Sequence, residues 1–113
     1  MKRIKIFHKK KFIEIELKEI NGWEKAIGLM FCRREKAKAL LFAFKKPVKL
    51  TIHSWFVFFP FVGIWLDKDN KIISIRRVSS FKNNVSPNGR FSKLIEIPIN
   101  KKYLNVVKFL VEN

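Results

Sequence analysis

The sequence predicts a mainly β, α+β domain: a compact small barrel or sandwich of six to eight short strands with one or two short helices. Three observations carry this prediction. Apolar and polar residues alternate with period two in several short segments, turn-forming residues separate these segments, and helical spacing is clear in only one place. The 113 residues, 48% of them hydrophobic, are expected to form a single domain over 1–113 around one core.

The N-terminal residues predict a β-hairpin with a basic tip. Ile4 and Ile6 alternate with charged residues, and residues 12–17 continue the same period after a short break. The break is His8-Lys9-Lys10-Lys11, which joins the two expected strands.

After residue 22 the period changes to that of a helix. Trp23, Ile27, Met30 and Phe31 lie at positions i, i+4, i+7 and i+8, which share one helical face. We expect a short helix that ends near residue 32, because Gly28 lowers helix propensity in its interior. The basic residues 33–36 then form a solvated loop.

The rest of the chain predicts short strands separated by turns. Pro60 cannot donate to a β-ladder, so it should split the long apolar run over 50–66. Asn100 is expected to cap a helical turn, and residues 106–111 fit either a last strand or a continuation of that helix. The elements expected between them are a buried strand over 40–44, a turn over 67–70, a return strand over 71–78, a long loop over 82–90 and a strand over 94–97.

Several blocks of residues follow one another in an order that matches a known family. They are Gly28-Leu29-Met30-Phe31 with Arg33, then Leu40-Leu41-Phe42-Ala43-Phe44, then His53-Ser54-Trp55 with Phe59-Pro60 and Leu66-Asp67, and finally Leu94-Ile95-Glu96-Ile97. Together they cover about residues 23–99 and resemble a divergent member of the family called domain of unknown function 192. The resemblance implies a small β-rich fold with short helices and no established activity.

The chain departs from that family pattern around Pro60. Val57 and Phe58 stand where the family usually has Met-Arg, and Phe61 and Val62 stand where it has Ile-Asp. If the family's Arg and Asp form a polar site, the resemblance implies that this site is absent here.

Charge is the strongest compositional feature. There are 25 Lys and Arg residues against 9 Asp and Glu, for a net charge of +16, and such a field attracts polyanions. We therefore expect an uncharacterised, non-enzymatic binding module with RNA or DNA as its partner. The sequence leaves open whether the basic clusters share one face. The candidate nucleic-acid-binding residues are Lys9, Lys10, Lys11, Arg33, Arg34, Arg76 and Arg77.

No catalytic or metal-binding constellation is recognisable. Cys32 is the one cysteine, next to two arginines that would favour its thiolate, and His8 and His53 are the only histidines. A metal site needs several Cys, His or carboxylate groups at suitable spacing, and a phosphate loop needs clustered glycines. We therefore expect no catalytic residue, no metal and no cofactor, although an enzymatic role stays open.

Two other functions remain as alternatives. His53 and Ser54 would line a small-molecule or enzymatic pocket, or His53 would simply be hydrogen-bonded within a sheet. Phe58 and Val62 lie four residues apart, so they would form an apolar patch for self-association or a protein partner if that face is open, and part of the core if it is covered.

The sequence also predicts a cytoplasmic protein without a membrane span. A single cysteine excludes an internal disulfide, and the N-terminal residues mix charge with apolar residues, unlike a signal peptide. The longest uncharged apolar run, over 55–66, is shorter than the roughly 20 residues that a helical span requires.

Overall fold

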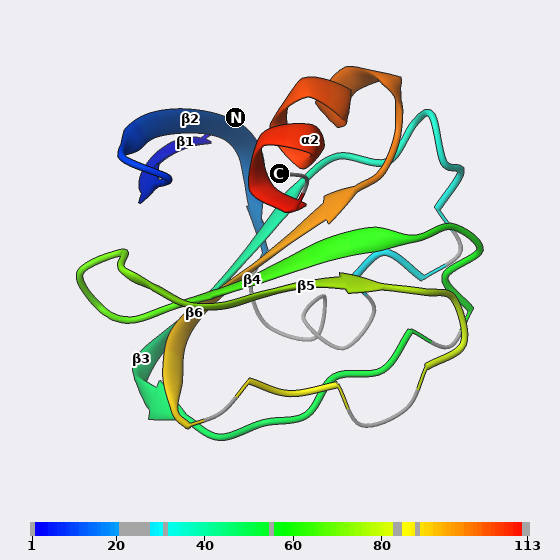
Figure 1. Ribbon diagram of the computed structural model, residues 1–113. Helices are drawn as coiled ribbons and strands as arrows, with labels where there is room; N and C mark the ends of the chain where they lie inside the picture. Colours follow the sequence, from blue (N-terminus) through cyan, green and yellow to red (C-terminus); the bar gives the residue numbers. More distant parts are fainter. Residues whose placement is uncertain are drawn as a thin grey trace.

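Six strands form one sheet that curls into a half-barrel, and a short C-terminal helix lies against it (Figure 1). The computed structural model describes residues 2–20, 28–30, 32–54, 56–82, 85–87 and 89–111. The mainly β fold class predicted from the sequence is confirmed. Within these residues the elements are β1 (Lys2–His8), β2 (Lys11–Ile20), β3 (Leu40–Val48), β4 (Phe61–Leu66), β5 (Ile72–Val78), β6 (Phe91–Pro98), the 3-10 helix η1 (Lys101–Tyr103) and α2 (Leu104–Val111).

The strand order is β1-β2-β3-β6-β4-β5, so β6 lies in the middle of the sheet although it is the last strand in the sequence. It pairs antiparallel with both β3 and β4, while β2 and β3 pair parallel over Lys18–Ile20 and Leu40–Phe42 only. All the residues of β6 except the half-buried Lys93 are buried, so a polar side chain elsewhere on this strand is held away from solvent.

The predicted N-terminal hairpin is confirmed. β1 and β2 pair antiparallel, with His8 opposite Lys11, so only Lys9 and Lys10 form the turn. Both have positive φ, 52° and 65°, which is the arrangement of a type I′ hairpin turn. Ile4 and Ile6 point inward with the alternating apolar residues of β2, as period two requires.

The predicted breaks in the middle of the chain are also confirmed. β4 begins directly after Pro60, whose carbonyl accepts a hydrogen bond from Ile99 N at 3.1 Å. The turn before β5 is held by Asp67, whose Oδ1 accepts from Asp69 N at 2.8 Å and from Lys71 N at 2.9 Å.

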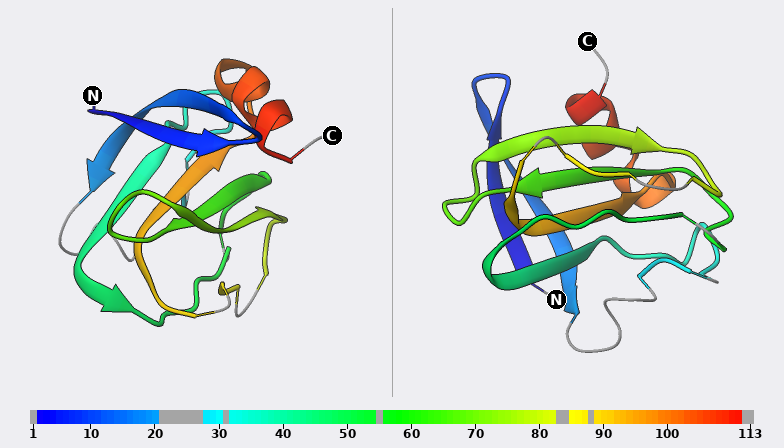
Figure 2. Two further views of the ribbon diagram at one scale, coloured as in Figure 1. Left: turned by 60° about the vertical axis from the view of Figure 1, so that its left-hand side comes forward. Right: turned by 90° about the horizontal axis from the view of Figure 1, so that it is seen from below.

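The C-terminal segment is a helix, so the strand alternative for residues 106–111 is wrong. Asn100 caps it as expected: its Oδ1 accepts from Tyr103 N at 3.3 Å. Tyr103, Val107 and Leu110 are buried at positions i, i+4 and i+7, and this stripe packs on the sheet only if the segment is helical. Figure 2 shows α2 beside the N-terminal hairpin, where Lys9 Nζ donates to the carbonyl of Phe109 at 2.8 Å.

The helix expected after residue 22 falls largely outside the described residues. What is described of it, residues 28–30, is a turn. The loop expected over 33–36 is confirmed as a turn, closed by hydrogen bonds from Lys36 N and Ala37 N to the carbonyl of Arg33. No helix in the part of the chain that the structure describes is long and apolar enough to cross a membrane.

The two faces of the sheet carry separate hydrophobic cores. On one face, Ile95 and Ile97 of β6 pack with α2 and the hairpin. On the other face, Leu94 of β6 packs with a core rich in aromatic side chains, Phe42 and Trp65 among them. Alternation along β6 places Glu96 on the same face as Leu94, within this second core.

Candidate functional site: a pocket around Glu96

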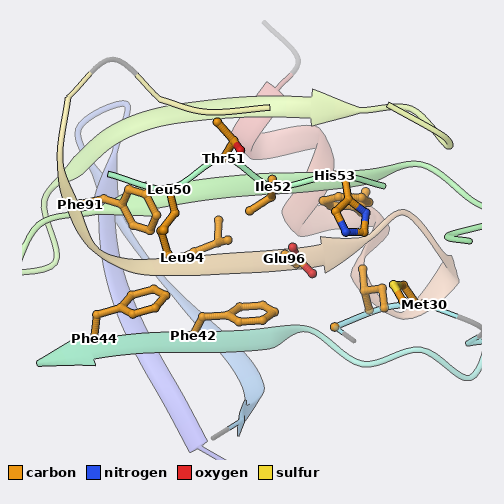
Figure 3. A pocket seen from close by; sticks show the side chains of 13 residues that line it. Met30, Phe42, Phe44, Leu50, Thr51, Ile52, His53, Phe91, Leu94 and Glu96 are labelled. Atoms are coloured by element: carbon orange, nitrogen blue, oxygen red, sulfur yellow. The ribbon is translucent and has the colours of Figure 1, made fainter. Parts of the chain in front are cut away.

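A pocket of about 330 Å³ opens over the second core. Its walls come from three strands, β3, β4 and β6, and from two segments without regular structure, residues 28–30 and 50–53. Phenylalanine side chains dominate the lining, and three polar side chains join them (Figure 3). The phenylalanines are Phe42, Phe44, Phe61 and Phe91, and the polar residues are Thr51, His53 and Glu96.

Glu96 supplies the buried polar group of the pocket. It lies in the centre of the sheet with Leu40 and Gly63 as its register partners, and it is only 7% exposed. Its carboxyl points into the pocket between Phe42 and the segment that carries His53 (Figure 3). Among the described residues no hydrogen bond or ion pair reaches this carboxyl, in contrast to most buried carboxyl groups.

Burial raises the pKa of Glu96 from its ordinary 4.5 to about 8. The cause is desolvation, which disfavours the ionised form. At neutral pH the side chain is therefore mainly a neutral carboxylic acid, which can both donate and accept a hydrogen bond.

Gly28 lies directly against the Glu96 carboxyl. A Cβ atom at Gly28 would be 3.1 Å from Glu96 Oε1 and 3.4 Å from Phe42 Cζ, and φ at this glycine is +54°. Both the close approach and the positive φ favour glycine. The turn over residues 28–30 can therefore lie over the carboxyl and close one side of the pocket.

His53 and Ser54 point to different places. His53 lines the pocket, but Ser54 is fully buried outside it. The Ser54 hydroxyl donates to Ser79 O at 2.6 Å and accepts from Lys82 N at 2.6 Å, so it anchors the chain after β5. Adjacent residues of an extended segment point in opposite directions, which explains the separation.

The basic clusters lie on three elements of the fold. Lys9, Lys10 and Lys11 form the hairpin tip, Arg33 and Arg34 precede β3, and Arg76 and Arg77 lie in the edge strand β5. Two of them are tied into the fold by hydrogen bonds: Lys9 Nζ donates to Phe109 O at 2.8 Å, and Arg34 Nε donates to Ile99 O at 2.7 Å and so holds its turn to the start of η1. The other five have exposed side chains, and none of these five is in an ion pair with another described residue.

Phe58 and Val62 do not share one exposed face. Phe58 is 61% exposed and contacts Phe81, with ring centroids 5.6 Å apart, while Val62 is fully buried in the first core. Pro60 separates them, so the strand periodicity that would align them does not run through both.

Cys32 is a half-buried thiol. Burial raises its pKa more than the charge of Lys18 lowers it, so the thiol form is favoured at neutral pH. Within the described residues, no group of three or more His, Cys, Asp or Glu side chains could hold a metal ion.

Neither Glu96 nor Gly28 is predicted from the sequence as a site residue. A signal for Glu96 was present, because it is the one charged residue between apolar neighbours in the strand expected over 94–97. This strand lines the pocket together with the sequence blocks that contain Gly28, Phe42 and His53. All four blocks on which the family resemblance rests therefore contribute to the wall of the pocket.

Solved structures share this fold. A protein of unknown function from Novosphingobium aromaticivorans DSM 12444 superposes with a TM-score of 0.70 at 17% identity, covering 93% of this chain and 77% of the other. A proposed transcription regulator from Sinorhizobium meliloti 1021 gives the same TM-score and identity, covering 93% of this chain and 83% of the other. At this level of identity the likeness establishes the fold alone.

The sequence comparisons agree with the resemblance. No functionally curated protein matches the chain. The sequence pattern of DUF192, described as an uncharacterized ACR, matches residues 4–102, and so extends the similarity beyond the blocks to the N-terminal hairpin. The chain therefore belongs to the DUF192 family.

Proposed function

We propose that this protein is a small-molecule-binding module whose ligand occupies the pocket over Glu96. The observation that carries the proposal is a buried carboxyl, without a described partner, that points into a pocket lined by phenylalanines. A buried polar group without a partner destabilises the fold, and a ligand that completes its hydrogen bonds recovers that free energy on binding. The volume of about 330 Å³ is at the lower end of the range for small-molecule pockets.

The chemistry of the pocket selects a ligand with a flat ring system and an amide-like edge. Four phenylalanine side chains favour an aromatic or otherwise apolar body. A neutral carboxylic acid offers one donor and one acceptor side by side, so it pairs best with a group that presents an acceptor and a donor in the same spacing. Lactams and related heterocycles have such an edge.

Exposed cations that are close in sequence to the lining residues favour an anionic substituent on the same ligand. We define the rim as Lys45, Lys46, Lys49 and Arg90, which are all exposed and lie within two residues of the lining residues Phe44, Leu50 or Phe91. A ligand whose ring enters the pocket with its charge turned toward the rim would satisfy both regions.

The test uses 1-anilinonaphthalene-8-sulfonate, which combines an apolar ring system with an anion and fluoresces when its rings leave water. We expect saturable binding to the wild type. Thr51→Phe should fill the pocket mouth with its ring and keep the dye out. The dye then loses its apolar contacts with the pocket walls, so its binding should weaken at least about tenfold. Asn105→Phe, which adds the same side chain on the exposed face of α2, should bind like the wild type.

Displacement then tests the role of Glu96. A bicyclic lactam, 2-quinolinone, should displace the dye from the wild type at lower concentration than naphthalene, and Glu96→Leu should abolish that preference. Equal binding of the dye to Thr51→Phe and to the wild type would refute a ligand in this pocket. Equal displacement by the two compounds would refute the role assigned to Glu96.

A cytoplasmic location is part of the same proposal. It rests on the single cysteine, since proteins of oxidising compartments commonly depend on disulfides.

A further inference from the structure

The tip of the N-terminal hairpin carries two phenylalanines that the fold does not cover. Phe7 and Phe12 are opposite each other in the β1–β2 register, on the side of the hairpin that faces away from the core. They are 55% and 67% exposed, and their ring centroids are 4.9 Å apart. Such exposure of a paired aromatic surface is typical of a contact site for another molecule.

Lysines surround this aromatic pair. Lys5 Nζ lies 5.9 Å from the centroid of the Phe12 ring, and two further lysines are exposed nearby in the chain, Lys10 in the turn and Lys11 at the start of β2. In the described part of the chain neither Lys10 nor Lys11 forms an ion pair. The three described ion pairs instead use other residues, and two of them involve Glu16, farther along the same face. Lys10 and Lys11 therefore add positive charge without a described ion pair near the aromatic pair, while Glu14, the register partner of Lys5, adds an exposed carboxylate.

The turn itself holds its lysines in an unfavourable backbone conformation. Lys9 and Lys10 have φ of 52° and 65°, positions where Asn-Gly is the usual sequence because an ordinary side chain is destabilised there. A chain selected only for folding would not be expected to place lysine at both positions. The Lys9 ammonium donates to Phe109 O within the fold, so it is the conformation of Lys10 that indicates a role for an ammonium group at this tip.

We propose that the hairpin tip, defined as Lys5, Phe7, Lys10, Lys11 and Phe12, binds single-stranded nucleic acid. The exposed rings stack with bases, and the lysines neutralise neighbouring phosphates. The net charge of +16 favours a polyanion, and the aromatic pair favours one with flat bases over an acidic peptide. Base pairing would hide the faces that stack on the rings, so a duplex fits this tip less well. This surface is separate from the pocket, and the inference does not depend on the small-molecule function.

The test is fluorescence anisotropy with a labelled oligouridine of about ten nucleotides, within the site sizes typical of such proteins. The titrations are repeated over a salt series that includes physiological ionic strength, about 0.15 M. We expect Phe7→Leu/Phe12→Leu to weaken binding at least about tenfold, since each stacked base contributes about 1–3 kcal/mol. Lys10→Gln/Lys11→Gln should make the dependence of log K on log salt less steep. The magnitude of the slope should fall by about 1.4, or about 0.7 for each phosphate contact on a single strand.

The chain offers a matched control for each variant. Phe58→Leu/Phe81→Leu removes a second exposed aromatic pair, and Lys36→Gln/Lys38→Gln removes two exposed lysines in the segment before β3. Both control variants should bind the oligouridine with an affinity within about twofold of that of the wild type, since they change neither an aromatic ring nor a charge at the hairpin tip.

Four outcomes would overturn the proposal. One is binding that disappears at physiological salt, because the attraction is then non-specific charge. Another is an equal loss in a control variant. The third is equal affinity for oligouridine, its duplex with oligoadenosine and a polyglutamate peptide, because bases would then contribute nothing. Oligothymidine in the same titration separates RNA from single-stranded DNA, and weaker binding of both than of polyglutamate would also refute the assignment.

Discussion

Gly28 and Glu96 are far apart in the sequence, yet the backbone of one lies against the carboxyl of the other. The position of a Cβ atom on Gly28 is 3.1 Å from Glu96 Oε1. This contact closes one side of the pocket and helps to keep water from the carboxyl, so the glycine and the raised pKa of Glu96 belong to one arrangement.

Gly28→Ala should therefore change both stability and binding. The positive φ alone costs about 1 kcal/mol for alanine, and the new methyl group must displace the Glu96 carboxyl. We expect a loss of about 2 kcal/mol in urea denaturation and weaker binding of 1-anilinonaphthalene-8-sulfonate.

Gly89→Ala is the control, because φ there is also positive but nothing lies within 4 Å of the added methyl group. It should lower stability without changing dye affinity. Normal dye affinity in Gly28→Ala would show that the turn does not shape the pocket.

The stability of the protein should fall as pH rises from about 5 to about 8. In this window Glu96 is protonated in the folded chain but ionised in the unfolded chain, because burial raises its pKa from 4.5 to about 8. The folded state thus binds more protons, and the free energy of unfolding decreases by at most about 1.4 kcal/mol per pH unit. Above the folded pKa both states are ionised and this contribution becomes constant.

Urea denaturation at several pH values, compared between the wild type and Glu96→Gln, isolates this contribution from the general effect of the net charge. The glutamine variant should become more stable relative to the wild type as pH rises. Parallel curves for the two proteins would mean that Glu96 titrates normally.

Asn100 should contribute more to stability than an ordinary helix cap. Besides accepting from Tyr103 N, it donates through Nδ2 to Arg34 O at 2.8 Å and to Ala37 O at 3.1 Å, and it is 4% exposed. Asn100→Ala leaves these buried groups without partners, so we expect a loss of about 2–3 kcal/mol in chemical denaturation. Asn105→Ala, on the exposed face of α2, is the control, and its free energy of unfolding should stay within about 0.5 kcal/mol of that of the wild type. An equal loss of stability in the two variants would contradict the role given to Asn100.

Lys10→Gly should stabilise the protein although it removes a side chain. Glycine adopts the φ of 65° at this turn without the steric penalty, so we expect a gain of about 0.5–1 kcal/mol. Lys11→Gly makes the same charge change one residue later in β2, where glycine should instead destabilise by about 0.5–1 kcal/mol. Thermal denaturation of both variants checks that the two substitutions change the stability in opposite directions. A loss of stability in both variants would show that the turn is unstrained.

Local patterns in the sequence predicted the strands well. Period two marked the hairpin, Pro60 marked the start of β4, and the Asp67 turn preceded β5, because each depends on neighbouring residues only. Residues 106–111 stayed ambiguous because short apolar segments fit both periods. The segment is a helix and not a strand because only a helix buries Tyr103, Val107 and Leu110 together against the sheet.

The pocket could be predicted only in part. His53 was singled out, but its neighbour Ser54 turns into the interior, and the sequence does not show which of two adjacent side chains faces a cavity. Glu96 was missed because its burial depends on segments that meet it only in three dimensions, above all the turn at Gly28. The polar groups of a pocket built from distant segments cannot be identified from local spacing.

The contact between the hairpin and α2 joins the first two described strands to the last described helix. Lys9 Nζ donates to Phe109 O, and the His8 ring packs edge-on against Phe109 at 5.7 Å between centroids. During synthesis the hairpin emerges well before Phe109, the residue that holds it against the barrel. Until α2 has left the ribosome, the seam between the hairpin and α2 stays open, and the apolar residues of β1 and β2 lack part of their cover.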